Sequence, residues 1–328
     1  MQDLASRGKT VVSGQKIKVL YITGSGRSGS TILDNILGQI EGFFPVGEFV
    51  YVWNRLVNGG TCSCGARFGE CEVWQPVLER AFGGPEGVDA REMARIQRTS
   101  TRPRHVPLAL TNAGEKLLRS RWTEEYRGAL GRFYREISNV TGSRVVVDSS
   151  KLPLYGRVLG EVPGVERYVV HLVRDPRAVA YSWLRKKRST AAGRGSAYMP
   201  QHHPVESSLE WDLCNVAAEW LRDDAPGRYT MLRYEDFVRE PRPAVERILR
   251  LVGEESRSLP FVSACGVELR RPNHNVGGNP SRFRTGVVEL SPDAEWATRM
   301  KGRDRRLVTA LTLPFLARFG YGVGAAGG

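Results

Sequence analysis

The chain has 328 residues, of which 41% are hydrophobic, and a formal net charge of +13 that arginine mainly supplies. This composition predicts a globular protein with a full core, in one domain that covers residues 1–328. It excludes a membrane span, which needs roughly 20 consecutive apolar residues, and the N-terminal residues lack the apolar segment of a secretory signal. We therefore expect a cytoplasmic protein with a flexible arm at residues 1–16.

The positive charge favours polyanionic partners. Zinc-finger spacing, an RNP-type motif and a contiguous basic arm are all absent from the sequence, so no nucleic acid partner is expected. Two sources of the charge stay open, an arginine-rich surface or a site for a small ligand that carries several negative charges.

The first predicted strand covers residues 17–23, which are apolar and β-prone. Residues 30–40 carry apolar side chains at helical spacing and predict a helix, and residues 42–50 predict a short strand or an extended segment. Between the first strand and the helix lies the sequence GSGRSGST, residues 24–31. A glycine-rich loop in this position typically binds phosphate at the N-terminus of the helix.

Residues 54–142 predict a mostly helical insertion, which we expect to face the acceptor. The tryptophans in and beside this region fit either an acceptor site or a core. The last part of the insertion has one apolar helix face, formed by Tyr126, Leu130, Phe133, Tyr134 and Ile137.

The five cysteines include one close group, Cys62, Cys64 and Cys71. A structural zinc site takes four ligands, and no histidine lies near these three in the sequence. We therefore predict no metal site here, but a turn-rich loop with buried thiols or a single disulfide.

The second half of the chain alternates strands with helices. Strands are predicted at residues 144–148, 167–173 and 229–232, and helices after Asp175-Pro176, at 209–221, at 243–252 and at 303–319 with an interruption at Pro314. Residues 270–284 form a basic loop that is too long for an idle linker, and His202 and His203 are expected on the surface. This order predicts an α/β fold, with a parallel sheet flanked by helices.

Two common phosphate-binding motifs fit the loop imperfectly. An ATPase P-loop places a lysine after the last glycine, where this chain has Ser30, so phosphoryl transfer is disfavoured. The dinucleotide motif GxGxxG is present, and Glu48 lies near the distance at which that motif has an acidic residue. An NAD(P)-dependent oxidoreductase is therefore a less favoured alternative.

A third pattern accounts for more of the chain. The stretch Gly26-Arg27-Ser28-Gly29-Ser30-Thr31 resembles the 5′-phosphosulfate loop of the sulfotransferases that use 3′-phosphoadenosine-5′-phosphosulfate (PAPS). The resemblance implies that Arg27 takes the place of the loop lysine of the cytosolic members. It also implies that the other residues of the stretch supply hydrogen-bond donors to the phosphosulfate.

A second signature of this family binds the 3′-phosphate through an arginine at a strand end and a serine eight residues later. Arg174 and Ser182 occupy these positions in the sequence RDPRAVAYS. The segment RYEDF is similar to a family stretch whose tyrosine approaches adenine, which implies that role for Tyr234. The late segment FRTG is a looser match, and it implies that Arg284, or Arg282 instead, closes over the 3′-phosphate.

The catalytic residues depart from those of the cytosolic members, which have a histidine base where this chain has Lys151. A protonated lysine cannot accept a proton at neutral pH. Another branch of the family uses a glutamate in a Gly-Glu context, which Gly47-Glu48 resembles, so Glu48 is the expected base. Arg27 and Lys151 are expected to stabilise the transferred group and the leaving phosphate.

The resemblance thus implies a P-loop NTPase-like sulfotransferase fold with a helical insertion. It implies PAPS as the donor, adenosine 3′,5′-bisphosphate as the product, no metal requirement and a small-molecule, sugar or lipid acceptor with a hydroxyl group. A nucleotide- or polyanion-binding module without turnover is the alternative from another functional class.

Overall fold

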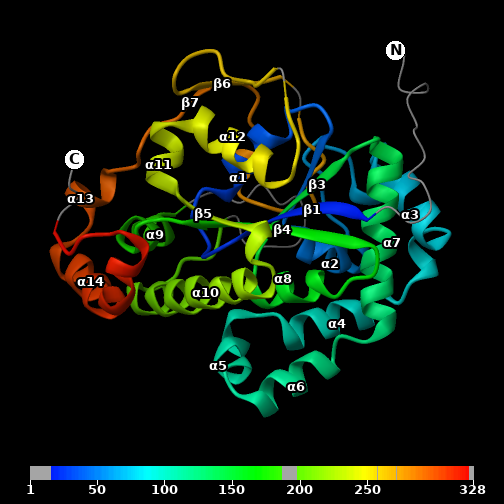
Figure 1. Ribbon diagram of the computed structural model, residues 1–328, viewed down its shortest axis with the longest axis horizontal. Helices are drawn as coiled ribbons and strands as arrows, with labels where there is room; N and C mark the ends of the chain where they lie inside the picture. Colours follow the sequence, from blue (N-terminus) through cyan, green and yellow to red (C-terminus); the bar gives the residue numbers. More distant parts are fainter. Residues whose placement is uncertain (1–15, 187–197, 257, 271, 325–328) are drawn as a thin grey trace.

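The computed structural model describes residues 16–186, 198–256, 258–270 and 272–324. Apart from Lys16, the predicted N-terminal arm lies outside this part of the chain. The centre of the molecule is a five-stranded parallel sheet in the order β2-β3-β1-β4-β5 (Figure 1). Its strands are β1 (Ile17–Thr23), β2 (Phe43–Gly47), β3 (Val145–Lys151), β4 (Val165–Val173) and β5 (Tyr229–Arg233). The predicted α/β class is confirmed.

Both faces of the sheet are covered by helices, because alternate residues of a strand point to opposite faces. Ile17, Val19 and Tyr21 pack in one core cluster, and Leu20 and Ile22 pack in another. The first face is covered by α7 (Glu124–Thr141), α8 (Pro153–Gly160) and α10 (Pro204–Asp224). The second face is covered by α1 (Ser30–Leu37), α11 (Tyr234–Arg239) and α12 (Pro241–Leu251) (Figure 1).

Residues 54–142 are mostly helical, but they do not form one separate unit. The helices are α2 (Val52–Asn58), α3 (Trp74–Phe82), α4 (Ala90–Ser100), α5 (Val106–Ala109), α6 (Asn112–Ser120) and α7. Helix α7 lies directly on the sheet, and its predicted apolar face is buried against β1 and β3. The tryptophans of this region belong to the same core cluster, namely Trp53, Trp74 and Trp122.

The C-terminal part contains α9 (Pro176–Leu184), α13 (Glu295–Arg299) and α14 (Gly302–Leu316). The predicted interruption at Pro314 is wrong, since α14 continues to Leu316. Pro314 has no N–H group to donate to the carbonyl group four residues earlier. Because Pro314 lies in the exposed last turn of the helix, that carbonyl group can bind water instead. None of the described helices is both long and apolar enough to cross a bilayer.

A two-stranded antiparallel hairpin was not predicted, and it consists of β6 (Gly266–Leu269) and β7 (Gly286–Glu289). The chain between them, residues 272–284, is called the strap here. The strap runs beside the end of β2, where the backbone N–H of Val276 donates to Val46 and that of Glu48 donates to Gly277, at 2.9 and 3.2 Å. This pairing explains why so long a loop is not an idle linker.

Candidate active site

Each of the five parallel strands ends in, or is followed by, a residue that the sequence predicted for the site. The order along the sheet is Glu48 after β2, Lys151 ending β3, the glycine-rich loop after β1, Arg174 after β4 and Tyr234 after β5. Carboxyl ends of parallel strands meet at one edge, where open α/β sheets bind ligands. The fold therefore brings residues as far apart in the sequence as Gly26 and Tyr234, 208 positions, to one edge of the sheet.

The loop after β1 has little room for side chains. A Cβ atom at Gly24 would lie 2.4 Å from the carbonyl oxygen of Leu172, and one at Gly29 would lie 2.4 Å from the ring of Tyr234. Gly29 has φ +92° and occupies the N-cap position of α1, where it offers no capping side chain. The first-turn N–H groups of α1, at Ser30 and Thr31, thus lie at a helix N-terminus, which favours an anion.

Ser28 holds the loop together through its side chain. Its hydroxyl group is buried and donates to the Ser25 carbonyl at 2.9 Å. Ser28 can then offer its backbone N–H to a ligand rather than its side chain. Gly26 packs against Trp183, whose ring would lie 2.8 Å from a Cβ atom at that position.

Arg27 has a left-handed backbone conformation with φ 64°. Its guanidinium stacks on the Trp183 ring at 4.4 Å and contacts the Met199 sulfur at 3.6 Å. Burial lowers its pKa and the charge of Glu48 opposes that shift, but an arginine stays charged in proteins. The second described non-glycine residue with a positive φ is Lys151, at 71°. Uncommon backbone conformations of this kind cluster at functional sites.

Arg174 joins the end of β4 to the loop. One of its nitrogens donates to the Arg27 carbonyl at 3.0 Å, and another pairs with the Asp293 carboxylate at 2.8 Å. The guanidinium also stacks on the Tyr234 ring at 4.5 Å. Ser182 is buried on α9, which begins at the Asp175 N-cap as predicted. The structure thus brings Arg174, Tyr234 and the loop into direct contact.

Glu48 and Lys151 form an ion pair in which Oε1 and Nζ are 2.5 Å apart. The backbone carbonyl of Lys151 accepts from the Thr23 hydroxyl at 2.9 Å and from the N–H of Gly24 at 3.2 Å. Lys151 therefore links the Glu48 carboxylate to the beginning of the glycine-rich loop.

Two buried carboxyl groups lie beneath the residues of the candidate site. Asp148 accepts hydrogen bonds from Tyr134 and Ser150, and Asp34 accepts one from Asn275 of the strap at 2.7 Å. Burial raises the pKa of Asp34 to about 7 and that of Asp148 to about 6. These groups are fully inside the protein, so they position neighbours rather than contact a ligand.

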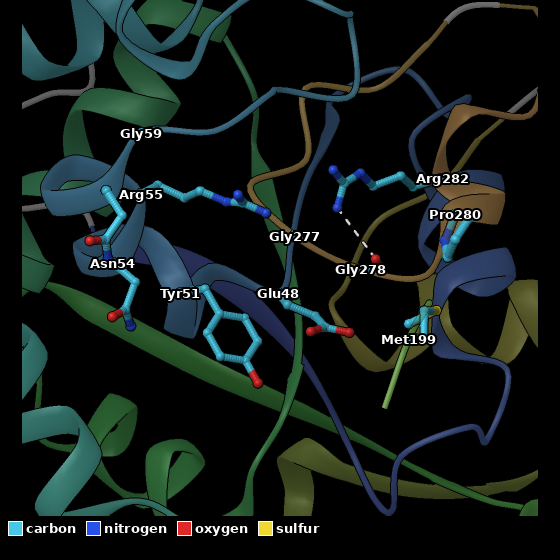
Figure 2. A pocket seen from close by; sticks show the side chains of 11 residues that line it. Glu48, Tyr51, Asn54, Arg55, Gly59, Met199, Gly277, Gly278, Pro280 and Arg282 are labelled. Atoms are coloured by element: carbon cyan, nitrogen blue, oxygen red, sulfur yellow. Dashed lines mark hydrogen bonds between the residues drawn. The ribbon is translucent and has the colours of Figure 1, made fainter. Parts of the chain in front are cut away.

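A cavity of about 360 Å³ opens beside Glu48. Figure 2 shows Arg55 from α2 and Arg282 from the strap directed toward each other, with Glu48 and Tyr51 below them in this view. Arg282 is buried and donates to the carbonyl groups of Gly278 and Thr61 at 3.3 and 3.4 Å. Of the two arginines predicted from the late loop, Arg282 lines this cavity, whereas Arg284 is exposed at the end of a short 3₁₀ turn.

Several residues of the site were not anticipated. Asp293, Trp183 and Arg55 contact the predicted residues or line the cavity, but no motif marks them in the sequence. His202 was expected on the surface, yet its ring stacks on Trp183 at 4.0 Å with parallel planes and its side chain is 19% exposed. The sequence feature that could have identified Trp183 is an aromatic side chain directly after Ser182.

The sheet order excludes the dinucleotide interpretation of the loop. In that fold the acidic residue ends the strand next to β1, whereas here β3 lies between β2 and β1. Glu48 is instead paired with Lys151 of β3.

Comparison with known proteins identifies the family of the chain. The sequence model of the Sulfotransferase family matches residues 20–257. Among solved structures, the chain is similar to the sulfotransferase domain from the curacin biosynthetic pathway, with 15% identity and a TM-score of 0.54 over 94% of this chain and 100% of that one. It is also similar to the sulfotransferase domain from the Synechococcus PCC 7002 olefin synthase, with 19% identity and a TM-score of 0.49 over 94% and 98% of the two chains. No curated protein sequence matches the chain. Because the family match covers more than half of its length, the chain belongs to the sulfotransferase family.

Proposed function

We propose that this protein transfers a sulfonate group from PAPS to a hydroxyl group of a small-molecule, sugar or lipid acceptor. The observation that carries the proposal is the 3.0 Å contact between the Arg174 guanidinium and the Arg27 carbonyl. It supports one binding site that extends from the glycine-rich loop to the arginine after β4. A donor with phosphate groups at both ends of its adenosine fits two adjacent anion sites of this kind.

The donor fits the residues that are present. The N-terminus of α1 and the backbone of residues 26–31 suit the 5′-phosphosulfate, since crowded glycines let a ligand approach the N–H groups closely. Arg174 and Ser182 suit the 3′-phosphate, and Tyr234, already stacked against Arg174, suits the adenine. Asp293 pairs with Arg174 in the protein alone, so a 3′-phosphate would replace that carboxylate as the partner.

The proposed reaction is an in-line displacement at sulfur. The acceptor oxygen forms a bond to sulfur as the bond between sulfur and the bridging phosphate oxygen breaks. Glu48 accepts the proton of the acceptor hydroxyl. Arg27 and Lys151 stabilise the charge that develops on the leaving phosphate, and adenosine 3′,5′-bisphosphate is the second product.

The acceptor is proposed to enter the cavity beside Glu48. Its lining includes the polar groups of Tyr51 and Asn54 and two guanidinium groups, which favours an acceptor that offers several hydrogen-bonding groups. Of the residues 54–142, those from α2 and its end reach this lining. We therefore restrict the expected acceptor-facing part of the insertion to this short segment, and we place Arg282 with the acceptor or the transferred group rather than with the 3′-phosphate.

The experiment is to incubate the protein with PAPS labelled in its sulfonate group and a panel of phenols, sugars and lipids. Label in an acceptor product supports the proposal, whereas tight binding of adenosine 3′,5′-bisphosphate without any transfer supports the alternative of a binding module. Glu48→Gln should lower the transfer rate by about 10²- to 10⁴-fold and leave the affinity for adenosine 3′,5′-bisphosphate within a few-fold. The exposed Glu86 supplies the control, and Glu86→Gln should change neither value. A full transfer rate in Glu48→Gln would show that another group is the base.

A further inference from the structure

Three thiols and one imidazole from distant parts of the chain meet outside the candidate active site. Cys62, Cys64 and Cys71 come from the loop between α2 and α3, and His274 comes from the strap. Their ligating atoms all lie within 4.8 Å of one another. The sequence-based expectation of no metal site depended on a missing fourth ligand, and the structure supplies that ligand from 203 residues further along the chain.

The separations match a tetrahedron around one zinc ion. Zinc bonds of about 2.3 Å to sulfur and about 2.0 Å to nitrogen place two sulfur ligands about 3.8 Å apart, and a sulfur and a nitrogen about 3.5 Å apart. The sulfur of Cys71 lies 3.7 Å from those of both Cys62 and Cys64. The His274 Nδ1 atom lies 3.2 Å from the Cys71 sulfur and 3.8 Å from the Cys62 sulfur.

A disulfide and an iron–sulfur cluster both fit these four residues less well than a single ion does. Sulfur atoms in a disulfide are about 2.05 Å apart, and all three cysteines are free thiols at much greater separations. An iron–sulfur cluster distributes its cysteine ligands over two or more irons, which requires a wider ligand set than one confined within 4.8 Å. A single ion with a preference for sulfur and imidazole remains.

Backbone hydrogen bonds of the loop after α2 place two of the ligands. A tight turn brings Cys62 and Cys64 together, because the N–H of Cys62 donates to Ala66 at 2.9 Å and that of Gly65 donates to Cys62 at 3.0 Å. Gly65 takes φ +95°, which glycine adopts readily.

The histidine is held on three sides. The Trp74 indole N–H donates to the His274 carbonyl at 2.8 Å, and the Phe44 ring stacks on the imidazole. Its Nε2 atom lies 3.6 Å from a Glu72 carboxylate oxygen, so Nδ1 is the nitrogen turned to the thiols. A carboxylate on the far nitrogen is the usual support of a metal-bound histidine.

We propose that Cys62, Cys64, Cys71 and His274 bind one structural zinc ion that fastens the loop after α2 to the strap. Four protein ligands leave no open position for a substrate, so the ion stabilises structure rather than performing chemistry. The residues after His274 reach the candidate active site, since Asn275 contacts Asp34, Val276 accepts from Arg55 and Gly277 pairs with Glu48. The zinc site thereby fixes the backbone beside Glu48, and it stands whether or not the sulfonate transfer is correct.

The experiment measures metal in the full chain, purified without chelators and also refolded with Zn²⁺. We expect one zinc per chain by elemental analysis. Replacement by Co²⁺ should give the thiolate charge-transfer bands and the strong visible bands of a tetrahedral site. Zinc at a small fraction of the chain in both preparations, or a cobalt spectrum without thiolate bands, would overturn the proposal, as would thiol titration that finds two of the three cysteines oxidised to a disulfide.

Variants connect the ion to these ligands. Cys64 is the least buried of the three thiols, so Cys64→Ser is the mildest change, and His274→Ala removes the ligand from the strap. Each should weaken zinc retention against a competing chelator at least tenfold and lower the melting temperature. Cys265→Ser removes a partly exposed thiol outside the cluster and should keep one zinc. Equal zinc retention in all variants would assign the ion to other residues. If a variant does not fold, the metal content and cobalt spectrum of the unmodified chain still decide the question.

Discussion

Arg174 combines three different contacts in the protein alone. It donates to the Arg27 carbonyl, pairs with Asp293 and stacks on Tyr234. A planar guanidinium with five donors can satisfy all of these directions at once, whereas a lysine ammonium could not stack in the same way. These contacts orient the side chain, and the proposed 3′-phosphate would replace the Asp293 carboxylate as its partner.

Arg174→Ala should weaken the binding of adenosine 3′,5′-bisphosphate by about 10- to 100-fold, because hydrogen bonds to charged groups contribute about 1.5–3 kcal/mol. Adenosine 5′-monophosphate, which lacks the 3′-phosphate, should lose much less affinity. Calorimetric titration of both nucleotides measures the difference. Arg185→Ala removes an exposed arginine paired with Glu295 and should leave both affinities unchanged. Equal losses for the two nucleotides would separate Arg174 from the 3′-phosphate.

At the scale of elements, the glycine-rich loop depends on close packing between β1, α1 and α11. Gly29 combines a left-handed backbone with the ring of Tyr234 at the place where a Cβ atom would lie. A new side chain could relieve neither the backbone strain nor the contact, because the position of its Cβ atom is fixed by the backbone. The loop and the first residue of α11 therefore form one packed unit.

Gly29→Ala should destabilise the protein by about 1–2 kcal/mol from the backbone conformation alone, with more from the contact with Tyr234. It should also abolish measurable nucleotide binding, since the loop must move away from the N-terminus of α1. Thermal unfolding and titration measure the two effects. Gly227 has open space around it and no positive φ, so Gly227→Ala should be neutral in both. Normal nucleotide affinity in Gly29→Ala would mean that the loop does not bind the nucleotide.

The sequence predicts the site residues at the strand ends better than those that come from the loops. Arg27, Glu48, Lys151, Arg174 and Tyr234 lie at or just after the ends of buried strands. Parallel strands end at one edge, so the strand pattern brings these residues together once the family resemblance has singled them out. The strap, which includes the proposed zinc ligand His274, and Asp293 lie in segments without hydrophobic periodicity. Their positions depend on contacts between residues more than 100 positions apart, such as Arg174 with Asp293 and Cys71 with His274. No local pattern in the sequence records such contacts.

At the scale of the whole molecule, two fully buried carboxyl groups lie beneath the candidate active site, one on strand β3 and one on helix α1. Asp34 and Asp148 are 0% exposed, and burial is the first cause of the raised pKa of each. A carboxyl group with a raised pKa in the folded state stabilises that state while it is protonated. The burial of these two carboxyl groups therefore lowers the free energy of unfolding at neutral and higher pH, where they ionise.

The pH dependence of stability provides the last prediction. The pKa of Asp34 is about 7 in the folded protein, against an ordinary value of 3.8 that applies to the unfolded chain. Its contribution to the free energy of unfolding is therefore fully present below about pH 4 and is lost as the pH rises through about 7. Between these values one such group changes the free energy of unfolding by at most about 1.4 kcal/mol per pH unit. In Asp34→Asn, the fall in stability from pH 5 to pH 8 should be smaller than in the unmodified chain, whatever constant cost the lost hydrogen bond from Asn275 adds. Urea unfolding at four pH values between 5 and 8 measures this slope.

The exposed Asp223 is paired only at the surface, so Asp223→Asn should keep the slope of the unmodified chain. An unchanged slope in Asp34→Asn would mean that Asp34 is ionised throughout this range and that its neighbours, Asn275 above all, compensate for its burial.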